Sequence, residues 1–294
     1  MIYRLKYVGF AVDDVSRTRR LFMDLFGLES RHLGPNRLIG ADNTATVPFP
    51  NQCSLYLMES AEAGSAVHRY LAEKGPGLER IGLLSDDIVG EYERVIRAGV
   101  PLGATALAEG PFGRQFTVPA HYVSGIAVDI IELHRVDELA PHYSSDASGV
   151  LGLQHIGVAV GSFVEAIVQF KSLFDLEMRN VRTDQHEGEQ KDGMIEPGND
   201  RLWLHITESW GPNARVRSFL ETKGPGLEHL CIEVADIRVA VNRVTEHNVP
   251  IWDHKIFTNR ADGFEGFIYP EHTSGVTIEL IEPYPTSRGY RPKR

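Results

Sequence analysis

Cysteine is scarce in this chain of 294 residues, which contains only Cys53 and Cys231. The two residues lie far apart, each within a strand-like segment. They offer neither a disulfide framework nor a pair of thiolate ligands, so a disulfide-rich secreted domain and a cysteine-based structural zinc site are excluded. We therefore expect two buried free thiols.

Long apolar runs and a basic excess are also absent. No segment approaches the roughly 20 consecutive apolar residues that span a bilayer, and the start of the chain lacks the apolar stretch of a signal peptide. Acidic side chains outnumber basic ones by 40 to 30, for a net charge of −10, which suits a polyanionic partner poorly. We expect a cytoplasmic protein that binds a small-molecule substrate, without nucleic-acid or membrane partners.

The sequence does contain an internal repeat. A segment that begins Tyr7-Val-Gly returns in related form at Arg80, His155 and His229, at intervals of 73, 75 and 74 residues. The motif Lys-Gly-Pro-Gly-Leu-Glu also occurs twice, from residues 74 and 223. The chain therefore consists of four related units, paired into two halves.

Each unit begins with a β-branched, apolar run that predicts a strand. Apolar residues spaced three and four apart follow, such as Val164, Ile167 and Val168 in the third unit, and this spacing predicts an amphipathic helix. Gly27 and Gly99 stand where the first two helices are expected to end.

Three further strand-like segments complete each unit, for example 176–182, 191–197 and 201–208 in the third. The predicted fold class is α+β, with four βαβββ modules paired into two cup-shaped mixed-sheet domains. We expect these domains over residues 1–140 and 150–285, divided by the polar stretch 135–150. The basic segment after Pro283 is expected to be poorly packed.

Four side chains of the second half occupy two equivalent positions of the repeat. His155 and His229 lie on the first strands of units three and four, and His205 and Glu279 follow 50 residues later on the last strands. Equivalent positions in two paired modules face one hollow from opposite sides. A single histidine in a strand is usually structural, but this placement predicts a convergent site.

Three imidazoles and a carboxylate around one hollow indicate a divalent-metal site. Two histidines with one carboxylate leave coordination positions open in the manner of non-haem Fe(II) enzymes. The cation would also balance the charge of a buried Glu279.

The first half has Tyr7, Tyr56, Arg80 and Asp129 at the same four positions. Tyrosine and arginine are poor ligands here, and an arginine beside an aspartate balances charge without an ion. We expect the first half to lack metal ligands and to support the second.

These features resemble the vicinal oxygen chelate superfamily, which includes glyoxalase I, methylmalonyl-CoA epimerase, the extradiol dioxygenases and 4-hydroxyphenylpyruvate dioxygenase. The resemblance covers nearly the whole chain. Its clearest motifs are His155-Ile-Gly-Val-Ala-Val, Gly224-Pro-Gly-Leu-Glu-His229 and Ser274-Gly-Val-Thr-Ile-Glu279. Proteins of this superfamily often form dimers or larger assemblies, so we expect a homo-oligomer.

A metal site confined to the second half resembles the extradiol dioxygenases in particular. The resemblance implies that His155, His229 and Glu279 bind Fe(II), although Mn(II), Co(II) or Zn(II) also suit this set. It further implies that His205 is an acid/base at the oxygen site and that Tyr269 contacts a substrate oxygen.

Two features depart from the extradiol pattern. Arg260 stands where those enzymes carry another histidine, and Gly-Pro-Gly-Leu-Glu-His is similar to methylmalonyl-CoA epimerase, whose metal takes a fourth protein ligand at the place of His205. If His205 binds the metal, proton-transfer chemistry is favoured, whereas a His205 that stands back leaves room for oxygen.

Three functions therefore remain open. The first is a metal-dependent dioxygenase for a catechol-like or 2-oxo-acid substrate that chelates the metal through vicinal oxygens. The second is an epimerase, isomerase or lyase that acts through a metal-bound enolate, with Glu279 or a residue of the stretch 187–196 as base. The third is a non-enzymatic small-molecule-binding protein. Aromatic residues near the site segments either line a substrate pocket or belong to the core: Trp203, Trp252, Phe257 and Phe264.

Overall fold

The structure is a computed structural model, and it describes residues 1–60, 62–103, 106–134, 149–184, 190–198, 202–211, 215–259 and 263–283. Most of the expected boundary at 135–150, the segment after Pro283, Arg260 and residues 187–189 lie outside the described residues.

The first half contains these elements: β1 (Ile2–Ala11), α1 (Val15–Phe26), β2 (Arg31–Asn36), β3 (Ala41–Pro48), β4 (Ser54–Glu59), α2 (Ala66–Lys74), β5 (Gly77–Ser85), α3 (Ile88–Arg97), β6 (Ala108–Glu109), β7 (Gly113–Val118), the 3-10 turn η1 (Ala120–Tyr122) and β8 (Ala127–Leu133). The second half repeats this order: β9 (Val150–Ala159), α4 (Phe163–Phe174), β10 (Met178–Asp184), β11 (Gln190–Ile195), β12 (Trp203–Ser209), α5 (Arg215–Lys223), β13 (Gly226–Val234), α6 (Ile237–Glu246), η4 (Trp252–His254), β14 (Phe257–Asn259), β15 (Gly263–Ile268), η5 (Pro270–His272) and β16 (Thr277–Pro283).

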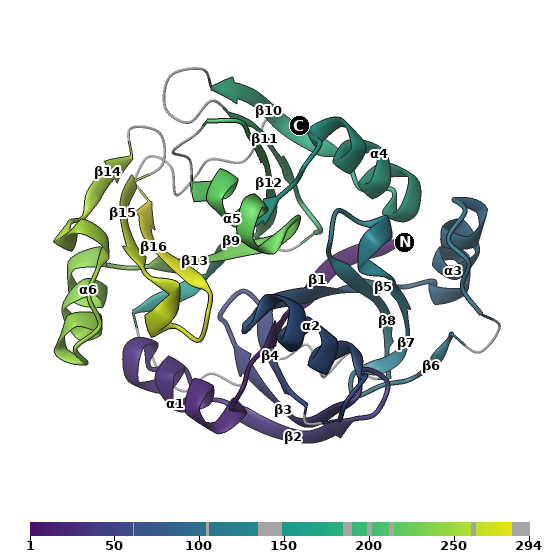
Figure 1. The fold of residues 1–294 in the computed structure, drawn as a ribbon, viewed down its shortest axis with the longest axis horizontal. Coiled ribbons are helices and arrows are strands. Elements are labelled where there is room, and N and C mark those ends of the chain that lie inside the picture. Colours follow the sequence, from purple (N-terminus) through teal and green to yellow (C-terminus); the bar gives the residue numbers. More distant parts are fainter. Residues whose placement is uncertain are drawn as a thin grey trace.

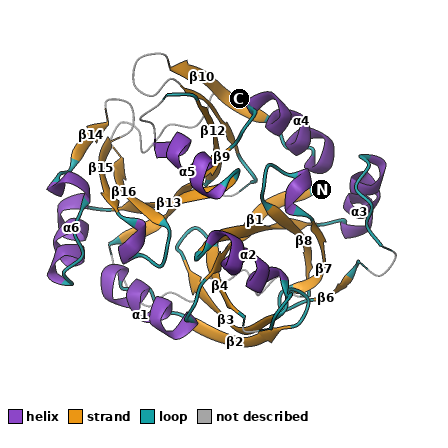
Figure 2. Ribbon diagram, viewed as in Figure 1, coloured by secondary structure: helices purple, strands orange, loops and turns teal. Residues whose placement is uncertain are grey.

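The strands of each half form one eight-stranded sheet. In the first sheet β1 and β5 pair antiparallel at the centre, and each pairs in parallel with the last strand of its own module, β4 or β8. The second sheet has the same order around β9 and β13. Two βαβββ modules thus meet in each curved sheet, and the predicted α+β fold is confirmed (Figure 2).

Two helices, α2 and α5, were not expected from the sequence. They connect the modules within each half, and Figure 1 shows them across the concave side of the two sheets, whereas α1, α3, α4 and α6 lie at the periphery. None of the described helices is long and apolar enough to cross a membrane.

The helix predicted from Val164, Ile167 and Val168 is confirmed as α4, and Ile167 packs against the core. Val164 and Val168 are 61% and 60% exposed, whereas Phe163, Phe170 and Phe174 are buried. Aromatic side chains bury more apolar area than valine, so they determine which face of the helix meets the sheet. The predicted end of α1 is confirmed, since Gly27 lies in the left-handed region with φ 66° at its C-cap. Helix α3 ends at Arg97, two residues before Gly99.

The concave side of the first sheet is filled by apolar side chains. Tyr7, Tyr56 and Phe112 form a cluster there with Val67 of α2, and all but Phe112 are at most 1% exposed. Among the described residues, the second sheet has no matching apolar cluster on its concave side.

A buried charge network lies at the base of this cluster. Arg80 Nη1 is 3.1 Å from Asp129 Oδ2, and Asp129 also accepts hydrogen bonds from Tyr7 and Thr117. Arg80 forms a second ion pair with its neighbour Glu79. Arg80 therefore supplies the cation beside both buried carboxylates of this network.

The two Lys-Gly-Pro-Gly-Leu-Glu motifs meet where the halves join. Lys74 Nζ donates to the carbonyl of Pro225 at 3.3 Å, and Lys223 Nζ donates to the carbonyl of Pro76 at 3.0 Å. The repeated motif therefore has a role in holding the two halves together.

Replacement of Arg80 by methionine would leave Asp129 and Glu79 buried without their cation. We expect Arg80→Met to lower the free energy of unfolding by about 3–5 kcal/mol, measured by denaturant titration. Arg97→Met is the control, because Arg97 pairs with Glu93 on the surface of α3, and we expect it to change stability by less than about 1 kcal/mol. Equal changes in the free energy of unfolding for the two substitutions would contradict the proposed role of Arg80 as the counter-ion of Asp129 and Glu79.

Candidate metal centre

The two histidines of the predicted ligand set lie on the adjacent strands β9 and β13. The antiparallel pairing of these strands shifts by one residue at Gln154 and again at Glu228, which directly precede His155 and His229. A β-bulge of this kind re-aims side chains that would otherwise alternate between the two faces. Gln154 and Glu228 can therefore contact the imidazoles of their own neighbours.

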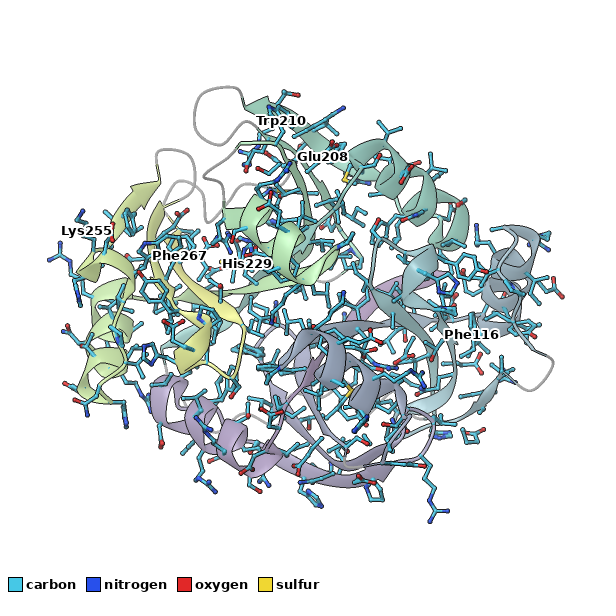
Figure 3. The ribbon with its side chains drawn as sticks, in the orientation of Figure 1. Phe116, Glu208, Trp210, His229, Lys255 and Phe267 are labelled. Atoms are coloured by element: carbon cyan, nitrogen blue, oxygen red, sulfur yellow. The ribbon has the colours of Figure 1, made fainter. Side chains whose placement is uncertain are left out.

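The donor atoms of three predicted ligands lie together. His155 Nε2 is 2.9 Å from His229 Nε2, and Glu279 Oε2 is 3.5 Å from His155 Nε2 and 3.3 Å from His229 Nε2. All three donor atoms lie within 4.8 Å of one another. The structure thus brings together His155, His229 and Glu279 from three neighbouring strands (Figure 3 labels His229).

The outer nitrogens of both rings have hydrogen-bond partners. His155 Nδ1 bonds to the side-chain oxygen of Gln154 and His229 Nδ1 to the carboxylate of Glu228. In a neutral imidazole, a proton on Nδ1 leaves the lone pair of Nε2 available as a metal ligand. The two Nε2 atoms, 2.9 Å apart, can therefore bind one cation when both rings are neutral.

This donor set fits a divalent metal. Metal–ligand distances of about 2.0–2.2 Å place neighbouring donor atoms roughly 3.0–3.5 Å apart, and the three separations here are 2.9, 3.3 and 3.5 Å. Two imidazoles and one carboxylate on one face also form the ligand set of the non-haem Fe(II) facial triad.

Protonation of the three groups is compatible with metal binding. Burial lowers the pKa of His155 to about 4, so this ring is neutral at pH 7. Burial opposes the ionised form of Glu279, but hydrogen bonds and charge from His155 and His229 outweigh it and hold the pKa well below its usual range. Burial likewise disfavours the His229 cation, while Glu228 outweighs burial and raises the pKa.

The second site is slightly less buried than its counterpart in the first half. His155 and Glu279 are 9% and 6% exposed, whereas the equivalent Tyr7 and Asp129 are 1% and 0% exposed. The same backbone scaffold therefore holds a filled core in the first half and a cluster of nearly buried donor atoms in the second.

His205 lies beside this cluster. Its ring is perpendicular to that of His155, with centroids 5.3 Å apart, but it does not belong to the group of three close donors. His205 Nε2 is 3.4 Å from Asp192 Oδ1, yet it is buried without a hydrogen bond to any described residue. In this structure His205 is thus oriented toward Asp192.

Asp192 is a site residue that the sequence analysis did not single out. It lies in the stretch 187–196, is 1% exposed, and accepts a hydrogen bond of 2.9 Å from Arg182 Nε. Burial opposes its ionised form, but the proximity of His205 and Arg182 outweighs burial and lowers the pKa. Side chains alternate along β11, so Asp192 lies on the same face as Met194, which pairs with His205. From the sequence alone, however, this alternation does not distinguish Asp192 from the other acidic residues of the stretch.

Tyr269 lies at the start of η5, directly after β15. Its ring stacks on Trp252 with centroids 5.6 Å apart. Among the described contacts, Tyr269 is joined to Trp252 and not to His155, His229 or Glu279. The structure thus does not bring Tyr269 into the ligand cluster, and its contact with substrate remains a prediction.

An aromatic wall flanks Glu279. Phe267 is the cross-strand partner of Glu279, and its ring contacts Trp252 and Phe257 at centroid distances of 5.9 and 6.3 Å. Figure 3 shows Phe267 near His229. Phe264 was a poor candidate for a pocket residue, because it occupies the alternate face of β15 and is 37% exposed.

The sequence analysis also missed the role of Gly157. A Cβ atom at this position would lie 2.0 Å from His229 Nδ1, so only glycine leaves room for the imidazole across the strand pair. In the first half, Gly9 makes room for Arg80 in the same way, with a Cβ position 2.3 Å from Arg80 Cγ.

We expect Gly157→Ala to displace the His229 ring and to weaken Co(II) binding by about 10-fold or more, measured by spectroscopic titration. Gly9→Ala is the matched control. It should lower the free energy of unfolding by about 1–3 kcal/mol through overpacking but leave Co(II) affinity unchanged. Loss of affinity in both variants would show that the effect comes from general destabilisation.

Comparison with known proteins identifies relatives by sequence. Residues 154–269 match the family model of the glyoxalase/bleomycin resistance protein/dioxygenase superfamily. The mitochondrial methylmalonyl-CoA epimerase of Dictyostelium discoideum is 26% identical over 136 residues, which are 46% of this chain and 80% of the epimerase. The uncharacterized protein YqjC of Bacillus subtilis is 29% identical over 132 residues, 45% of this chain and 91% of YqjC.

Two solved structures are similar over the whole chain. A mutant of 4-hydroxymandelate synthase from Streptomyces coelicolor has a TM-score of 0.71 at 14% identity, covering 96% of this chain and 93% of the synthase. A xylose isomerase-like TIM barrel/4-hydroxyphenylpyruvate dioxygenase fusion protein has a TM-score of 0.63 at 17% identity, covering 100% of this chain and 50% of the fusion protein. At these identities the likeness shows a shared fold.

Proposed function

We propose that the protein is a divalent-metal-dependent dioxygenase, on the premise that residues 154–269 match the family model of the glyoxalase/bleomycin resistance protein/dioxygenase superfamily. Its substrate would be a catechol-like compound or a 2-oxo acid that binds the metal through two neighbouring oxygens. The observation that carries the proposal is the cluster of His155, His229 and Glu279, with His205 beside it and not in it.

His155, His229 and Glu279 would hold the metal. Fe(II) is the proposed ion, and Mn(II), Co(II) and Zn(II) also suit two imidazoles and a carboxylate. When bound, the ion supplies Lewis-acid activation of the chelated oxygens and, as Fe(II), electrons for the reaction with dioxygen. Three protein ligands leave positions for a bidentate substrate and for oxygen, which a fourth ligand would reduce.

His205 is the proposed acid/base. Its ring lies beside that of His155 in the ligand cluster, so the imidazole would accept a proton from a substrate hydroxyl and return it to an oxygen later in the reaction. Asp192 Oδ1, 3.4 Å from Nε2, would orient the ring and stabilise its charged form. Phe267 and Trp252 would exclude water from one side of the substrate.

The likeness to 4-hydroxymandelate synthase and to the xylose isomerase-like TIM barrel/4-hydroxyphenylpyruvate dioxygenase fusion protein supports this proposal at the level of the fold. Because one fold hosts several reactions, the choice of a dioxygenase rests on the open coordination sphere and on the position of His205.

We expect the protein reconstituted anaerobically with Fe(II) to consume oxygen when a panel of catechols and 2-oxo acids is added. His205→Ala should retain Fe(II) but lose about 100-fold or more in turnover, because it removes only the proton carrier, whereas His155→Ala should lose Fe(II). An oxygen electrode measures the oxygen consumption, and metal analysis measures the bound iron. Absence of oxygen uptake with every member of the panel would exclude the dioxygenase.

A metal-dependent epimerase, isomerase or lyase is the second candidate. The buried carboxylate of Asp192 near His205 favours it, because this reaction needs a base beside an activated carbonyl. The sequence similarity to the Dictyostelium epimerase also supports it.

For this second candidate we expect solvent deuterium to enter a carboxylate or thioester substrate without oxygen uptake, as measured by NMR. Asp192→Asn would abolish the exchange while the metal stays bound. Oxygen-dependent turnover without deuterium incorporation would contradict this candidate and support the first.

A further inference from the structure

Glu228 is buried directly behind the ligand cluster, between a ligand and an arginine. One carboxylate oxygen contacts His229 Nδ1 and the other contacts Arg215 Nη1. Arg215 Nη2 also lies 3.4 Å from His229 Nδ1. We propose that Glu228, held by Arg215, is a positioning residue that fixes the His229 ring for metal binding; this inference rests on the proposed metal centre.

The bulge in β13 gives Glu228 this position. Without the shift in strand pairing, consecutive residues would point to opposite faces of the sheet, and Glu228 could not reach the ring of His229. Since the carboxylate accepts the Nδ1 proton, it fixes both the tautomer and the rotation of the imidazole. A carboxylate behind a metal-bound histidine also increases the basicity of the ligand nitrogen.

The repeat provides two comparisons for this role. The equivalent neighbour of the other ligand is Gln154, a neutral amide that contacts His155 Nδ1. In the first half the equivalent residue is Glu79, which pairs with Arg80. A glutamate at this position of the repeat thus balances a buried cation in the first half and holds a ligand ring in the second.

Arg215 connects Glu228 to helix α5. It is the first residue of α5, none of whose residues is fully buried, and its guanidinium lies 5.7 Å from the centre of the Phe267 ring. Arg215 and Glu228 also line a cavity of about 720 Å³ between the two halves, together with Arg17 of α1 and Trp252. The ion pair therefore lines this cavity on one side and contacts His229 on the other.

The test compares the metal affinity of matched variants. We expect the Kd for Co(II) to rise about 10-fold in Glu228→Gln, whose amide still accepts from Nδ1, and up to about 100-fold in Glu228→Ala. The visible absorption of bound Co(II) should change in Glu228→Ala and be partly restored in Glu228→Gln. Glu79→Gln is the control, and it should leave both the Kd and the spectrum unchanged even if its melting temperature falls.

The outcomes separate this inference from the metal centre itself. If the unaltered chain binds no Co(II), the metal centre and this inference both fail. If the unaltered chain binds Co(II) and Glu228→Gln and Glu228→Ala bind it equally well with the same spectrum, only the positioning role is overturned. Should Glu228→Ala fail to fold, Glu228→Gln alone decides, and a Kd within twofold of the unaltered chain overturns the inference.

Discussion

The site depends on the antiparallel pairing of β9 with β13. This pairing brings His155 and His229, which are 74 residues apart in the sequence, to a separation of 2.9 Å between ring nitrogens, and the two one-residue shifts provide each ring with an acceptor from its own neighbour. Both constraints are backbone properties, and the first half shares them. The candidate metal centre therefore differs from its counterpart in the first half by its side chains, on a scaffold that folds the same way in either half.

The two halves show what that change requires. In the first, Arg80 and Asp129 neutralise each other and aromatic rings fill the concave side of the sheet, so the module pair is closed. In the second, two imidazole nitrogens and a carboxylate oxygen face one another, an arrangement that a divalent cation would stabilise. The ligand residues thus leave the concave side of the second sheet less tightly packed. The filled core of the first half is connected to the second half through Lys74 and Lys223, and it can therefore stabilise the whole chain.

Repetition made much of this structure predictable from the sequence. Equivalent positions in repeated strands must share a face, so the convergence of His155, His229 and Glu279 followed from spacing alone. What could not be predicted were contacts that depend on departures from regular pairing. The bulge that turns Glu228 toward His229 has no distinct pattern of hydrophobic residues, and Asp192 is one acid among several in its stretch. The spacing of Val164 and Val168 suits a helix as well as the spacing of the phenylalanines does. The sequence pattern therefore did not show which of these residues α4 buries.

The position of His205 separates the two proposed chemistries. Turned toward Asp192, His205 stands outside the three-donor cluster, as the proposed dioxygenase requires. A rotation that brought the same ring to a bound metal would add a fourth ligand and release Asp192 to act as the base of the proposed epimerase. The buried carboxylate, paired with Arg182 on its other side, opposes that rotation by attracting the imidazole. The pairing of Asp192 with His205 would therefore support the dioxygenase, and its loss would support the epimerase.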